Sequence, residues 1–204
     1  MTSQEAQPAG PRTARPARPP RADAVRNRAR VLEAARAAFA AEGVAVPLDE
    51  IARRAGVGAG TVYRHFPTKE ALFEAVIADQ LAALAADAES RLAGAGEAGE
   101  QFFEFFVSVV DDGTRKADLA DALSSAGVGL RQETLAAAGR LQAGLAELLE
   151  RAQRAGAVRA DVDTTDLHAL AVGALAAERK RASGPGAEPG KLARIICDGL
   201  RLRD

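Results

Sequence analysis

The chain has 204 residues, of which 48% are hydrophobic and only 4% aromatic, and its formal net charge is −1. This length can hold one large domain or two small ones, and a core that Ala and Leu must fill predicts an all-α fold. The single cysteine excludes an internal disulfide, and the sequence lacks metal-ligand Cys/His clusters, apolar runs of about 18 residues and a signal-peptide core. We therefore expect a cytoplasmic protein with no metal, no cofactor and no membrane contact.

Charge is divided unevenly along the chain. Residues 1–69 contain 12 Lys and Arg against 6 Asp and Glu, whereas residues 70–204 contain 15 against 22. The first part therefore carries a charge of +6 and the second −7. This asymmetry indicates a nucleic-acid contact in the first part and predicts that the acidic remainder faces away from it.

Residues 1–23 are rich in proline and arginine, and we predict a disordered arm. Proline favours an extended polyproline II chain, which would place the arginines at positions 12, 15, 18 and 21 along one side. Two interpretations stay open. The arm either adds salt-dependent affinity for DNA or is a solvated tail with no specific role.

The segment Leu48–Phe73 predicts a helix-turn-helix, with the motif itself at about residues 47–66. Apolar residues spaced i, i+3, i+4 and i+7 from Leu48 give the first helix one inward face, and Gly56 suits a left-handed C-cap. In the second helix the expected inward residues are Ala59, Val62 and Phe66. The expected DNA-contacting residues are Gly60, Thr61, Tyr63, Arg64, His65, Lys69 and, in the preceding helix, Arg28.

The chemistry of these side chains suits DNA. Arg64 can donate two hydrogen bonds to guanine, and the methyl group of Thr61 suits the methyl group of thymine. The hydroxyl of Tyr63 could reach a phosphate oxygen. Lys69 lies in the first turn of the next helix, where Thr68 is the expected N-cap and unpaired N–H groups attract phosphate.

Three blocks of this region resemble the tetracycline-repressor (TetR) family of bacterial one-component regulators. Val31–Val44 resembles the first helix of the family, residues 48–57 the second, and Gly60–Val76 the recognition helix and the start of the fourth. The sequence departs from the family at Gly58 and Ala59, where Ser or Thr and a basic residue are common, so a side-chain cap and one phosphate contact are missing. Val46 and Pro47 stand where the family often has a Thr.

The resemblance implies two domains after the arm. Residues 24–84 would form the DNA-binding domain, and residues 85–204 a C-terminal domain that binds an effector and dimerises. In this second part a helix carries four phenylalanines over a broad arc, which could line a pocket or could simply fill the core. The expected pocket residues are Phe102, Phe103, Phe106, Val110, Leu123 and Leu135.

The rest of the C-terminal part predicts four further helices. They lie at about residues 116–125, 130–155, 166–181 and 189–201, with Gly156 ending the second of them. The resemblance implies that the last two meet their copies across a two-fold axis. The expected interface residues of this homodimer are Leu167, Leu170, Ala174, Leu192, Ile195 and Ile196.

These patterns predict a ligand-responsive transcriptional regulator. The resemblance implies a repressor that binds a pseudo-palindromic operator in double-stranded DNA as a homodimer and is released by a small-molecule effector. The alternative is an architectural DNA-binding protein or a regulator without an effector. We do not expect an enzyme, because the HExxH, P-loop and GxSxG signatures are absent and His65 and His168 fall in different predicted domains.

Overall fold

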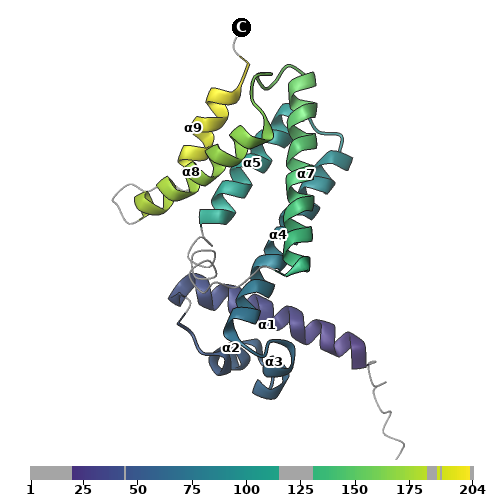
Figure 1. The fold of residues 1–204 in the computed structure, drawn as a ribbon, viewed down its shortest axis with the longest axis vertical. Helices are drawn as coiled ribbons and strands as arrows, with labels where there is room; N and C mark the ends of the chain where they lie inside the picture. The colour runs from purple at the N-terminus through teal and green to yellow at the C-terminus, as the bar shows by residue number, and fades with distance from the viewer. Residues whose placement is uncertain (1–19, 44, 115–130, 183–187, 189, 203–204) are drawn as a thin grey trace, which may run out of the picture.

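The computed structural model describes residues 20–43, 45–114, 131–182, 188 and 190–202. Figure 1 shows an elongated molecule, with α1, α2 and α3 gathered at one end and α5, α8 and α9 at the other. The long helix α4 runs between the two ends. The predicted all-α fold is therefore confirmed for the described residues.

The first end is the N-terminal domain. Its helices are α1 (Pro20–Glu42), α2 (Leu48–Ala55), α3 (Ala59–His65) and the first turns of α4 (Lys69–Ala93). Each helix contributes apolar side chains to one buried cluster, for example Leu32, Ile51, Val62 and Leu72. The small helices α2 and α3 thus acquire their stability by packing against α1 and against each other rather than from their own length.

Helix α1 begins at Pro20, earlier than the sequence pattern indicates. Residues 20–23, which we expected in the arm, are therefore helical. Proline suits the first position of a helix, because its φ is already helical and the N–H that it lacks would have no partner there. Residues 1–19 lie outside the described residues, and the disordered arm stays a prediction for them.

The second end is the C-terminal domain. It consists of α5 (Ala98–Thr114), α7 (Gln132–Arg154), α8 (Thr164–Ala182), α9 (Lys191–Leu200) and the last turns of α4. Its buried cluster contains Phe102, Phe105 and Phe106 together with Leu148 and Leu167. The helix expected at about residues 116–125 lies outside the described residues.

The loop between α7 and α8 begins at a glycine and is held by a β-bridge. Gly156 has a φ of 73°, the left-handed conformation that ends α7. An antiparallel β-bridge joins Val158 to Arg201, so the residues after α9 are held against the loop between α7 and α8. The end of α9 is thereby fixed to the α7–α8 loop.

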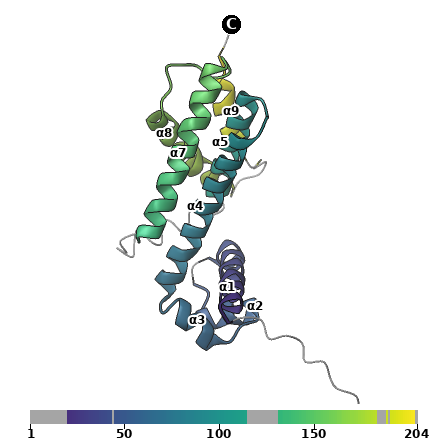
Figure 2. The same ribbon diagram turned by 90° about the vertical axis from the view of Figure 1, so that its right-hand side faces the viewer.

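Helices α4 and α7 lie side by side, as Figures 1 and 2 both show. Their backbones approach closely at Gly144, where an added Cβ would lie only 2.7 Å from the Cβ of Ala88. The α4–α7 pair is therefore tightly packed, and it spans the length between the two domains.

Candidate nucleic-acid interface

Helix α2 buries the face that its sequence pattern predicts. Leu48, Ile51, Ala52 and Ala55 are all buried, and the charged residues between them are on the other side. On that outer side Glu50 accepts hydrogen bonds from the Arg53 and Arg54 side chains at 2.6–2.7 Å. These bonds lower the pKa of the Glu50 carboxyl to about 2.

The turn between α2 and α3 depends on a left-handed residue. Gly56 has a φ of 62°, and its N–H donates to the carbonyl of Arg53 at 3.1 Å. The guanidinium of Arg30, on α1, covers this glycine so closely that an added Cβ would lie 2.5 Å from its Nη2. The contact with Arg30 was not evident from the sequence, because it joins residues on different helices.

Helix α3 is anchored by two side chains. Val62 is 0% exposed and Phe66, at its C-cap, is 3% exposed. Gly58 caps its N-terminus without a side-chain hydrogen bond, as expected from the missing Ser or Thr. Ala59 is exposed, which corrects the expected inward position, because the helix begins there and its first turn projects from the core.

The outer face of α3 presents the other expected residues together. Gly60, Tyr63 and Arg64 are exposed, and Thr61 and His65 are half-buried. Tyr63 has 46% of its surface exposed although it is a large aromatic residue. The face therefore combines a hydroxyl-bearing ring, a guanidinium and an accessible backbone, which are groups that contact bases and phosphates.

The start of α4 lies next to this face. Thr68 caps α4, because its hydroxyl oxygen accepts a hydrogen bond from the Ala71 N–H at 3.1 Å. Lys69 is half-buried in the first turn. The predicted cap is confirmed, and it leaves the positively polarised helix start beside Lys69.

Two further contacts fix α1 against the rest of the N-terminal domain. The rings of Phe39 and Phe73 lie 4.3 Å apart, and Arg36 pairs with Asp79 of α4 at 2.6 Å. Arg28 is half-buried, with its guanidinium carbon 5.8 Å from the centre of the Phe66 ring. Arg28 thus contacts the end of α3 within the chain, a role that the sequence did not suggest.

The expected pocket residues of the C-terminal domain do not all lie together. Phe102, Phe103, Phe106 and Val110 are buried in one cluster, with the Phe102 and Phe103 rings 5.3 Å apart. Leu135 is 56% exposed and does not belong to that cluster. Leu123 lies outside the described residues. The four clustered residues therefore contact one another as core residues do.

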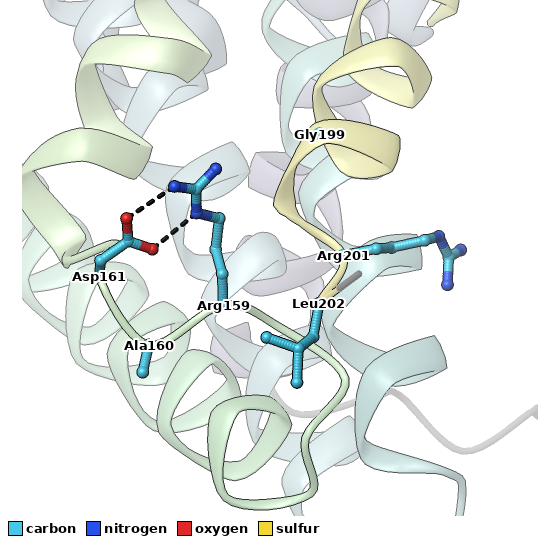
Figure 3. Close-up of a pocket in the computed structure, with 6 residues that line it drawn as sticks. All are labelled: Arg159, Ala160, Asp161, Gly199, Arg201 and Leu202. Atoms are coloured by element: carbon cyan, nitrogen blue, oxygen red, sulfur yellow. Dashed lines mark hydrogen bonds and ion pairs between the residues drawn. The ribbon is translucent and has the colours of Figure 1, made fainter. Parts of the chain in front are cut away.

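A shallow depression lies at the far end of the C-terminal domain (Figure 3). Arg159 and Asp161 form a doubly hydrogen-bonded ion pair at 2.6 Å on one side of it, while Arg201 points away. None of the expected pocket residues lines it. Within the described residues, no group of three or more His, Cys, Asp or Glu side chains is arranged to hold a metal ion.

The expected interface residues divide into buried and exposed groups. Leu167 and Ala174 are buried in the chain's own core, so they are not available to a second copy. Leu170 and Ile195 are 36% and 55% exposed, and Leu192 and Ile196 are half-buried. Further exposed residues of α8 are apolar or small, namely Ala169, Val172, Gly173, Ala176 and Ala177.

None of the described helices has both the length and the apolar character that a membrane crossing requires.

Two known protein families match this chain. Residues 31–76 match the family described as bacterial regulatory proteins, tetR family. Residues 97–202 match the C-terminal domain of SbtR-like transcriptional regulators. The first match covers the helices that build the interface described above, and the second covers α5 to α9.

Solved structures share both the sequence and the fold. A TetR transcription regulatory protein from Mycobacterium vanbaalenii is 49% identical, with a TM-score of 0.70, over 90% of this chain and 99% of that one. A TetR transcriptional regulator from Streptomyces coelicolor is 33% identical, with a TM-score of 0.69, over 87% of this chain and 99% of that one.

A shorter similarity links the chain to the transcriptional regulator SrpR of Pseudomonas putida, which is 45% identical over 60 residues. That segment is 29% of this chain and 28% of SrpR. The matched segment is thus well under two thirds of the length of SrpR.

Proposed function

Since this chain belongs to the TetR family of DNA-binding transcriptional regulators, we propose that it is a repressor that binds a pseudo-palindromic operator as a homodimer and leaves it when a small-molecule effector binds. The family is one of regulators and not of enzymes. The proposal therefore concerns the sites for DNA, for the second copy and for the effector.

One observation carries the DNA-reading part of the proposal. Val62 and Phe66 anchor α3, while Tyr63 and Arg64 are exposed on its outer side. A short helix with this arrangement can enter the major groove, which is wide enough for a helix and displays a distinct pattern for each base pair. We assign base contacts to Thr61, Arg64 and His65, and phosphate contacts to Tyr63 and Lys69.

The charge distribution supports the same orientation. The N-terminal part, with a charge of +6 over residues 1–69, would be attracted to the phosphate backbone. The remainder, with −7, would be repelled and would face away. Nonspecific attraction would therefore already favour the end of the molecule that presents α3.

The exposed apolar surface of α8 and α9 supports the homodimer. Val172 is 53% exposed and Ile195 is 55% exposed, and small residues lie beside Val172 on α8. Small residues allow two helices to approach closely, and a second copy would remove this apolar surface from water. A two-fold dimer would present two α3 helices and would match an inverted repeat.

We place the effector site in the C-terminal domain, beside the aromatic residues of α5. Phe103 supports this position, because it lies at the edge of the cluster and lines an open groove between α5 and α9. Val107 and Cys197 line the groove with it, together with the charged side chains of Glu104, Asp111, Arg194, Asp198 and Arg201. Burial raises the pKa of the Cys197 thiol to about 11, so Cys197 would act in this groove as an apolar wall and not as a nucleophile. An effector that lowers operator affinity about 100-fold would need about 2.7 kcal/mol of coupling.

The test is selection of genomic DNA fragments by purified protein at physiological salt, followed by sequencing of the retained DNA. Enrichment of a short inverted repeat is the expected result, and the Arg64→Ala variant should enrich it weakly. Retention of DNA without a common motif would refute operator recognition and would favour an architectural protein. If no small molecule releases the protein from the inverted repeat, the proposed regulation by an effector is refuted.

A further inference from the structure

The α4–α7 pair connects the two domains through contacts spread along its length. Near its upper end, Arg151 of α7 donates to the carbonyl of Leu92 at 2.6 Å. Midway, Arg140 of α7 pairs with Glu89 of α4 at 2.8 Å, with both side chains about half exposed. At the end of the pair next to the N-terminal domain, the contact involves a buried carboxylate instead of an exposed one.

That carboxylate belongs to Glu74, which is 2% exposed. One of its oxygens accepts hydrogen bonds from the backbone N–H of Arg131 and from the Thr134 hydroxyl, the latter at 3.3 Å. The other oxygen pairs with Nε of Arg131 at 2.8 Å. Thr134 is itself 1% exposed, so its hydroxyl and the Glu74 carboxylate meet away from water.

Glu74 thereby caps a helix that cannot cap itself. Helix α7 begins after Arg131, whose side chain makes no capping hydrogen bond. The first N–H groups of a helix have no partners inside it, and the partial positive charge there favours a carboxylate. Burial of Glu74 costs free energy that these three partners offset, so loss of any one of them leaves a buried charge or donor poorly paired.

Glu74 lies in the turns of α4 that belong to the N-terminal domain. Leu72, Phe73 and Val76, next to it on α4, are buried in the core of the N-terminal domain that holds α3. The far half of α7 contributes Leu148 to the core of the C-terminal domain. The Glu74 contact therefore fixes the start of α7 against the helical turns of α4 that hold the DNA-reading domain.

From this geometry we infer that Glu74, with Arg131 and Thr134, is a positioning site that fixes the N-terminal domain relative to the C-terminal domain and so sets the half-site spacing that the dimer accepts. The inference rests on the proposed function, because spacing has a meaning only for two reading domains on one operator. Insertion of one base pair moves a half-site by about 3.4 Å and rotates it by roughly 35°. Rigidly held reading domains reject such a change, whereas loosened ones adapt to it.

The experiment compares two operators that differ by one central base pair: the selected inverted repeat and the same repeat with one base pair inserted. We measure the dissociation constant for the operator with the insertion and divide it by that for the original repeat. This ratio is compared between the wild type and the variants Glu74→Gln and Thr134→Val. Glu74→Gln keeps the shape and removes the charge, and Thr134→Val removes only one donor. Glu89→Gln is the matched control, because it removes a carboxylate that pairs with an arginine of α7 but is exposed.

We expect Glu74→Gln to lower this ratio about fivefold and Thr134→Val to lower it about twofold, with Glu89→Gln unchanged. A loss of folded protein would weaken binding to both operators equally and would leave the ratio unchanged, so the ratio separates positioning from stability. If Glu74→Gln does not fold, as judged by helical circular dichroism, Thr134→Val decides. Wild-type ratios in the folded variants would overturn the inference, whereas a wild type that selects no inverted repeat would overturn the proposed function instead.

Discussion

The N-terminal and C-terminal domains bury similar apolar side chains but expose different surfaces. Helices α2 and α3 bury one face each and expose charged or hydrogen-bonding groups such as Arg53 and Tyr63. Helices α8 and α9 also bury one face each, yet Val172 and Ile195 remain exposed on their outer sides. The first surface suits a polar, negatively charged partner and the second an apolar one, so the outer faces separate the roles of the domains more clearly than their cores do.

The largest expected effect concerns the aromatic core of the C-terminal domain. Phe102→Ala should lower the free energy of unfolding by about 3–5 kcal/mol, because Phe102 is 0% exposed and its removal leaves a cavity. Urea denaturation followed by circular dichroism measures this change. Tyr63→Ala, at an exposed aromatic residue of the N-terminal domain, should change it by less than about 0.5 kcal/mol. Similar values for the two variants would contradict the buried position of Phe102 and the exposed position of Tyr63.

The next effect concerns the outer face of α3. Arg64→Ala should weaken binding to the selected operator by about 1–3 kcal/mol, because a bidentate contact with guanine would be lost. Binding to random DNA should change much less, and fluorescence anisotropy with both DNAs measures the two losses. Equal losses on the two DNAs would assign Arg64 to phosphate contact.

A smaller effect is expected at the turn between α2 and α3. Gly56→Ala should destabilise the folded protein by about 1–2 kcal/mol, because its φ of 62° is unfavourable for a residue with a Cβ and Arg30 would have to move. Thermal unfolding measures it. Gly58→Ala is the matched control, since Gly58 has a φ of −65° and open space around it. An unchanged melting temperature for Gly56→Ala would mean that the turn tolerates another conformation.

The smallest effect is the pH dependence that Glu50 of the N-terminal domain contributes. Arg53 and Arg54 lower the pKa of Glu50 from 4.5 to about 2, so this carboxylate stabilises the folded state above about pH 4.5. That contribution is lost as the pH falls from 4.5 towards 2, because the lowered pKa is a property of the folded state. Melting temperatures of the wild type should therefore fall more steeply across this range than those of Glu50→Gln. Parallel curves would show that these exposed ion pairs contribute nothing measurable.

Much of the N-terminal domain could be predicted from the sequence. The inward face of α2, the left-handed Gly56 and the Thr68 cap all follow from residues within one or two helical turns of one another. The start of α1 at Pro20 was harder to predict, because the residues there are rich in proline and arginine and resemble the preceding arm. The contact of Arg28 with Phe66 could not be predicted either, because the two residues are 38 positions apart, too far for a local pattern to indicate.

The expected sites of the C-terminal domain were less well determined. Helix α8 has apolar residues on every side, from Leu167 to Ala177, so periodicity does not distinguish the face that packs inside from the face that stays exposed. The structure buries Leu167 and Ala174 and exposes Val172. The phenylalanines of α5 raise the same difficulty, because a broad aromatic arc is compatible with a core and with a pocket.

By itself the sequence determined the helical class, the helix-turn-helix and the charge difference between the two parts of the chain, because each depends on residue spacing or composition. Only the tertiary structure decided which apolar face of α8 is exposed and that Glu74 caps α7. Glu74 and Arg131 are 57 positions apart, and nothing in the neighbourhood of either residue indicates the other. Contacts between distant helices depend on how whole helices pack together, and that is settled by the combined shape of their side chains and not by any local repeat.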